Sequence, residues 1–154
     1  MAALNRAFGL TLPPEEAQYL ELYLAAYLGA EDPWSSAQEM ELRNLEAALI
    51  REMEKALHTD LSGYTSLRDD LYCHLRPMLL RVEQNIRTEN PQLDTIRTAY
   101  PGLWKATRTA CDAVQQQFVL PAISDDEAAY LAMHFGAVLE QNAMFRLRLR
   151  VVVA

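Results

Sequence analysis

Apolar side chains recur every three or four residues along most of this chain, which is the spacing of one face of an α-helix. The two longest stripes consist of Leu42, Leu45, Leu49, Met53 and Ala56, and of Leu67, Leu71, Leu75, Met78 and Val82. Only 5 of the 154 residues are glycine, and β-branched residues are scarce outside the last positions, so the composition favours helix. We therefore predict an all-α fold.

Capping and proline signals divide the chain into six predicted helices. Proline in a first helical turn, and Ser or Asn immediately before one, are typical helix starts. Asn90 followed by Pro91 is such a start, and Ser124 with Glu127 has the spacing of a capping box. The predicted helices span residues 13–28, 36–58, 66–85, 91–99, 101–118 and 124–141.

The last residues follow a different period. Phe145, Leu147, Leu149 and Val151 alternate with arginines, and three valines follow one another near the end, which is the pattern of a β-strand that enters a buried sheet. One strand cannot satisfy its own backbone groups. We favour the opening strand of a following α/β domain in a longer protein. The alternative is a strand that pairs with a second copy of the chain.

An internal repeat indicates the domain organisation. Residues 15–28 align with residues 126–139, and six of the fourteen positions are identical. Two amphipathic helices can share apolar positions by chance, but the matched Glu, Ala and Tyr favour a true repeat. We predict that residues 1–33 hold the last helix of a preceding copy. Residues 34–142 then form one complete domain, and residues 143–154 lead into the next.

Charge and cysteine content argue against several classes of protein. The chain has 21 acidic and 14 basic residues and a formal net charge of −7, whereas a general nucleic-acid binder needs excess Lys and Arg to displace phosphate counterions. The 2 cysteines form neither a disulfide framework nor a zinc-binding pattern. We see no bilayer-spanning run and no signal peptide, so we expect a cytoplasmic protein that contacts neither nucleic acid nor membrane through this segment.

The last predicted helix is apolar almost all round, yet it carries one polar stripe. Glu127, Tyr130, His134 and Gln141 lie within about 60° of one another on a helical wheel. Polar groups on a buried helix must meet water, a partner molecule or a hydrogen-bonding group of the fold. The spacing leaves two roles open for His134, a structural histidine or one that faces a partner. In the repeat, Tyr23 occupies the position of His134.

A second histidine has a similar setting. Asp70, His74 and Arg81 lie within about 40° of one another, beside the apolar stripe of the third predicted helix. Asp70 is one turn before His74, where its carboxylate could accept an imidazole N–H and set the tautomer. Arg81 is two turns beyond, where it could meet an anion held at the ring. Pro77 predicts a kink between them. The alternative is a surface trio without special function.

Other chemistry has little support in the sequence. Cys73, His74 and His134 are a weak ligand set for a metal, and Cys111 is expected to be a buried, inert thiol. There is no Gly-rich phosphate loop and no nucleophile elbow. We expect no cofactor and no metal, and a protein that is not an enzyme.

Three segments of the chain together resemble one known family. They are LYCHLRPMLLR at residues 71–81, Asn90-Pro91 with the later Tyr100-Pro101, and DEAAYLAMHFGA at residues 126–137. In this order and spacing they are similar to the phosphotransferase-system regulation domains, or PRDs, of bacterial activators and antiterminators of sugar operons. The resemblance covers about residues 60–142. It is strongest to the second domain of an activator of the mannitol-operon type.

This resemblance implies an antiparallel bundle of about five helices. It also implies that His74 and His134 are the phosphorylated histidines, that Asp70 and Arg81 support them, and that the site at Tyr23 in the preceding copy is silent. The expected donors are the phosphocarrier protein HPr and enzyme IIB, and a homodimer is the usual assembly. The segment 143–154 resembles the first strand of an enzyme IIB-like domain. The alternative function is a helical interaction or dimerisation module whose histidines are structural.

Overall fold

The structure, a computed structural model, describes residue 20 and residues 35–140. Several predictions fall outside these residues: the helix over residues 13–28 with Tyr23, the position of Gln141, and the strand near the end of the chain. All the elements that are described between residues 35 and 140 are helices, which confirms the predicted all-α fold.

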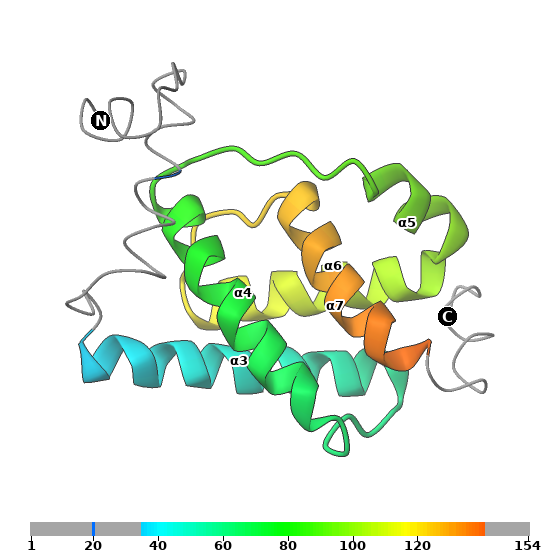
Figure 1. Ribbon diagram of the computed structural model, residues 1–154, viewed down its shortest axis with the longest axis horizontal. Coiled ribbons are helices and arrows are strands. Elements are labelled where there is room, and N and C mark those ends of the chain that lie inside the picture. Colours follow the sequence, from blue (N-terminus) through cyan, green and yellow to red (C-terminus); the bar gives the residue numbers. More distant parts are fainter. Residues whose placement is uncertain (1–19, 21–34, 141–154) are drawn as a thin grey trace.

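Within residues 35–140, five helices form an antiparallel bundle of two crossed pairs (Figure 1). They are α3 (Ser36–Leu57), α4 (Thr65–Glu83), α5 (Leu93–Ala99), α6 (Pro101–Gln117) and α7 (Asp125–Leu139). α3 packs along α6, and α4 packs along α7 in the opposite direction and crosses over the first pair. The short α5 lies against α6 and α7. The contact between α4 and α7 brings together the candidate site residues described below.

The apolar stripes of the sequence meet in one core between the two pairs of helices. The most deeply buried large side chains include Leu42, Leu49, Met53, Leu67, Leu71, Leu75, Met78, Leu131, Phe135 and Leu139. Gly136 allows α7 to approach α6 closely, since a Cβ at this position would lie 3.0 Å from Leu103 Cδ2. The core therefore fixes the position of α7 from one side and leaves its other side to face α4.

Two helix starts show how side chains fix the backbone. Ser35 Oγ accepts a hydrogen bond from the Gln38 N–H (3.3 Å), and the Gln38 side chain accepts one from the Ser35 N–H (2.8 Å), a complete capping box. At α7, Ser124 Oγ accepts from the Glu127 N–H (3.2 Å). The Glu127 carboxylate does not return to the cap, so the predicted capping box is only half formed. That carboxylate is used in the site described below.

The helix start predicted at Asn90 and Pro91 is two residues early, since α5 begins at Leu93. The Asn90 side chain accepts from the Gln92 N–H (2.9 Å), and its carbonyl accepts from the Leu93 N–H (3.1 Å), so these residues form a turn before the helix. The Asn90 N–H donates to Asp126 Oδ1 (2.8 Å). The turn thereby anchors the α4–α5 connection to the first turn of α7.

Three helices end in the same way. His58, Asn85 and Val119 have positive φ angles of 50°, 53° and 53°, and in each case the following N–H donates to the carbonyl five residues back. This is the Schellman arrangement, which satisfies carbonyls at a helix end. His58, the last residue of the predicted second helix, thus closes α3 by its backbone.

Candidate functional site

The antiparallel contact of α4 and α7 brings His74 and His134 together. Their ring centroids lie 4.9 Å apart, with the ring planes inclined by 51°. Both side chains are half-buried, so the pair lies at the edge of the interface between the helices. The sequence singled out each histidine separately, but nothing in its spacing indicated that the two rings touch.

His74 is held in its neutral form. Its pKa is lowered from 6.5 to about 3, chiefly by burial, and the neighbouring His134 and the positive charge of Arg81 contribute to this shift in the same direction. The Nε2 atom of His74 is buried and has no hydrogen-bond partner in the described part of the chain. A buried polar atom without a partner is uncommon, and here it lies on a ring that contacts another titratable ring.

His134 is neutral at pH 7 for a related reason. Burial lowers its pKa, while the nearby carboxylate of Asp70 opposes the shift. Asp70 is exposed, and no hydrogen bond between it and His74 is present among the described residues. The charge of Asp70 therefore acts on His134 across the helix contact, and its supporting role in phosphorylation stays a prediction.

Arg81 and Glu127 form a buried ion pair at the same α4–α7 contact. Arg81 Nε donates to Glu127 Oε1 (2.6 Å) and Arg81 Nη2 donates to Glu127 Oε2 (2.9 Å), the bidentate geometry that suits a guanidinium and a carboxylate. Both side chains are under a tenth exposed. An anion at the histidine pair would have to share Arg81 with Glu127. The sequence showed Glu127 as a cap and part of a polar stripe, and missed this role.

Tyr130 joins the histidine site to the chain that precedes α5. Its ring centroid lies 5.9 Å from that of His74, and its hydroxyl donates to the Glu89 carbonyl oxygen (3.0 Å). Tyr130 is one helical turn before His134, so both rings lie on the face of α7 that meets α4. The polar stripe of the sequence contained Tyr130, but only the structure shows that it forms one wall of the site.

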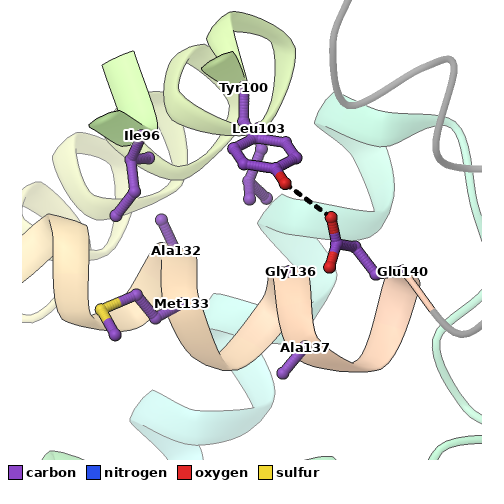
Figure 2. A pocket seen from close by; sticks show the side chains of 8 residues that line it. All are labelled: Ile96, Tyr100, Leu103, Ala132, Met133, Gly136, Ala137 and Glu140. Carbon is purple, nitrogen blue, oxygen red and sulfur yellow. Dashed lines mark hydrogen bonds between the residues drawn. The ribbon is translucent and has the colours of Figure 1, made fainter. Parts of the chain in front are cut away.

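A separate pocket lies on another face of α7, between this helix and α5 and α6. Figure 2 shows the pocket, which has a volume of about 260 Å³, with Tyr100 Oη donating to Glu140 Oε1 (2.7 Å). Its lining is mostly apolar and includes Ile96, Leu103 and Met133. Met133 adjoins His134 in sequence but lies about 100° away around the helix, so the pocket is distinct from the histidine pair.

Residue 20 and residues 35–140 also bear on metal binding, thiol reactivity and membrane insertion. No group of three or more His, Cys, Asp or Glu side chains there could hold a metal ion. Cys111 is buried, which raises the pKa of its thiol to about 12, in agreement with the expected inert cysteine. In these ranges, no helix has the length and apolar character needed to span a bilayer.

Two known proteins are similar in sequence to this chain over most of its length. The chain is 30% identical over 143 residues to the transcriptional regulator ManR of Bacillus subtilis (strain 168), and 27% identical over 148 residues to the probable licABCH operon regulator of the same organism. Each alignment covers 90% of this chain but only 22% of the relative. No solved structure matches the chain.

A family model identifies the domain. The PRD domain model matches residues 47–138, which is more than half of the chain and runs from α3 to the end of α7. The matched region contains His74, His134, Asp70 and Arg81, and it covers the region of the three segments that carry the resemblance. Sequence motifs, helical architecture and family match agree: the chain belongs to the PRD domain family.

Proposed function

We propose that this chain is the regulatory domain of a transcription regulator of a sugar operon, controlled by phosphorylation of His74 and His134 by the phosphotransferase system. The observation that carries the proposal is the 4.9 Å contact between the two rings at the edge of the α4–α7 interface. Family membership and the similarity to the two regulators support the regulatory role.

The histidine pair has the protonation state that a phosphoryl acceptor needs. A phosphoryl group is transferred to the lone pair of a neutral imidazole nitrogen, and burial keeps both rings neutral at pH 7. The proposed donors are phosphorylated HPr or phosphorylated enzyme IIB. The donor surface would supply most of the transfer site, and Asp70 would act on the ring of His134.

Phosphorylation would change the charge of the α4–α7 contact. It turns a neutral ring into a group with roughly two negative charges and several strong acceptor oxygens. The nearest buried charges are those of Arg81 and Glu127, of which the first attracts the new group and the second repels it. The phosphoryl group interacts differently with two alternative arrangements of the contact. The contact changes its arrangement when this difference in interaction free energy exceeds the free-energy difference between the two arrangements, typically a few kcal/mol.

The proposal includes the predicted domain organisation. Residues 34–142 would be one PRD, residues 1–33 the end of a preceding PRD, and residues 143–154 the linker and first strand of an enzyme IIB-like domain. The family match over residues 47–138 lies inside the central segment. A homodimer and the comparison with a mannitol-operon activator also remain predictions.

Phosphorylation in vitro tests the function. The chain is incubated with phospho-HPr or with phosphorylated enzyme IIB, and phosphoryl groups are counted by intact mass spectrometry under alkaline conditions. We expect His74→Gln and His134→Gln each to lower incorporation and the double variant to abolish it. His58→Asn is the matched control, because its side chain is exposed at the end of α3; it should retain full incorporation.

The rival function predicts a different result. If the domain is an interaction module with structural histidines, neither donor labels the wild-type chain, and each histidine substitution lowers the free energy of unfolding. Unchanged labelling of the double variant His74→Gln/His134→Gln would contradict the site assignment.

A further inference from the structure

We propose that His74 and His134 act as one acceptor unit in which the ring that does not carry the phosphoryl group takes up a proton and balances its charge. As a consequence, the second phosphoryl transfer is much slower than the first. This inference rests on the proposed function, since it concerns how the same two histidines share the modification. It is drawn from the contact of the rings and the charges around them.

The geometry makes the two modifications interdependent. The ring centroids are 4.9 Å apart, so a phosphoryl group on either ring lies within a few ångströms of the other imidazole. Two such groups would place like charges of about two units each into one half-buried contact. Repulsion between like charges is strong where water is partly excluded. An imidazole beside a phosphorylated ring is therefore a poor acceptor for a second phosphoryl group.

The surroundings of the pair decide the direction of the proton change. Among the described residues, Arg81 acts on His74 and Asp70 acts on His134. Arg81 is itself ion-paired with Glu127 on α7. The pKa of His74 is low because of burial and because its neighbours include a second imidazole and a guanidinium. A phosphoryl dianion on His134 reverses the sign of the nearest charge, so it raises the pKa of the remaining ring.

The buried Nε2 atom of His74 supports this arrangement. It has no hydrogen-bond partner among the described residues, which leaves its hydrogen-bonding capacity unused in the unmodified domain. A negative group on the adjoining ring supplies an acceptor for an imidazolium N–H, the stronger kind of hydrogen bond. The unmodified site thus already contains a buried polar atom that an added acceptor group would satisfy.

The transfer itself balances simply. The lone pair of a neutral imidazole nitrogen of the domain forms a P–N bond, the bond between phosphorus and the donor atom breaks, and its electron pair remains on the donor atom. The neighbouring imidazole then binds a proton from water. Phosphorylation of the domain is therefore coupled to proton uptake near neutral pH.

The test uses phosphoramidate, a small donor that modifies imidazoles without a protein surface. The 154-residue chain carries His58→Asn, so that only the paired histidines can react. The variants His74→Gln and His134→Gln, in the same background, give the rate of each ring alone. From these two rates the time course of doubly phosphorylated chain is calculated for independent sites, and compared with intact mass spectra of the paired protein.

We expect the second addition to be at least tenfold slower than independent sites predict, and urea-unfolded chain to show no such difference. In the singly phosphorylated protein, nitrogen-15 NMR titration should show that the unmodified ring is protonated at pH 7. Accumulation of doubly modified folded chain at the independent rate, or a second ring that stays neutral at pH 7, overturns the inference.

The two hypotheses fail in different ways. If the second addition is independent while phospho-HPr or phosphorylated enzyme IIB still labels the histidines, the acceptor unit is refuted and the proposed function stands. If phosphoramidate shows the slow second addition but neither protein donor labels the chain, the rings are coupled and the proposed function is refuted.

Discussion

The imidazole of His74 lies where a positive charge is unfavourable, because the ring is largely buried beside His134 and Arg81. In the unfolded chain it binds a proton near pH 6.5, and in the folded chain only near pH 3. The unfolded state therefore binds more protons between these values. The contribution of neutral His74 to stability is fully present above about pH 6.5 and is lost as the pH falls toward 3.

The lower pKa of His74 in the folded chain predicts that the free energy of unfolding decreases as the pH falls. One pKa unit corresponds to about 1.4 kcal/mol, and solvent reduces the effect for a half-buried side chain, so we expect a loss of roughly 2 kcal/mol between pH 6.5 and about pH 4. Urea unfolding of wild type and His74→Gln across this range measures it. The carboxylates titrate in both proteins and cancel in the difference.

Tyr130→Phe provides the control for this measurement. It removes the hydrogen bond to Glu89 but leaves both imidazoles, so its acid sensitivity should equal that of wild type. If His74→Gln loses stability with falling pH as steeply as wild type does, the burial of His74 does not govern the acid response.

The Arg81–Glu127 pair gives a second prediction at this scale. Removing Arg81 leaves the Glu127 carboxylate buried without its ion-pair partner, so Arg81→Met should lower the free energy of unfolding by about 3–5 kcal/mol. The double variant Arg81→Met/Glu127→Leu also removes the buried carboxylate, and we expect it to be more stable than Arg81→Met. Urea unfolding at pH 7 checks this order.

An exposed ion pair serves as the comparison. Lys55 Nζ and Glu52 Oε1 are 2.7 Å apart, but the lysine side chain is 69% exposed. Lys55→Ala should change the free energy of unfolding by less than about 1 kcal/mol. A loss as small as this in Arg81→Met would show that the buried pair adds little to the α4–α7 contact.

At the scale of elements, the end of α6 is less favourable than the ends of α3 and α4. Val119 has a φ of 53° and is 88% exposed, so a β-branched residue takes up a left-handed conformation without gaining burial. That conformation costs a non-glycine residue about 1–2 kcal/mol. Part of this is offset by the greater freedom of glycine in the unfolded chain. We expect Val119→Gly to stabilise the domain by about 0.5–1 kcal/mol in urea unfolding.

Two further substitutions test whether the gain in stability comes from relief of backbone strain at Val119. Val119→Ala keeps the strained φ with a smaller side chain and should give little or no gain. Asn85→Gly changes a residue that tolerates positive φ comparatively well, so its gain should be smaller than that of Val119→Gly. Equal gains in all three variants would show that backbone strain at Val119 is not their cause.

The helices themselves follow from the sequence because each one buries an apolar stripe, and a stripe such as Leu67, Leu71 and Leu75 has only one regular structure that can bury it. Boundaries depend on local geometry that composition does not show. Val119 gives no sign of a helix end, and Asn90 forms a turn rather than the expected cap. α5 consequently begins at Leu93, two residues later than predicted.

The candidate site was predictable only in part, because its residues come from different helices. The polar stripe and the family motifs indicated His74 and His134, but their contact depends on how α4 packs along α7. The hydrogen-bond partner of Glu127 likewise depends on how the helices pack. Its spacing from Ser124 suggests a cap, yet the buried guanidinium of Arg81 binds it more strongly than a cap amide does.

At the scale of the molecule, the histidine pair belongs to the five-helix bundle of residues 35–140. The buried core they form runs from Leu42 to Leu139, inside the proposed domain of residues 34–142. α4 and α7 lie over α3 and α6, so a change in the α4–α7 contact acts on packing shared by the whole domain.

This arrangement predicts that residues 34–142 fold on their own. The shortened chain should unfold in one cooperative urea transition, with a midpoint close to that of the 154-residue chain, and should retain phosphorylation by the donor that labels the longer chain. A chain of residues 34–124 is the control. It lacks Leu131, Phe135 and Leu139 of α7, so α4 loses the partner that bears His134 and cooperative unfolding should disappear. If residues 34–142 lose cooperativity while the full chain keeps it, the outer segments contribute to the fold, and the proposed domain boundaries are wrong.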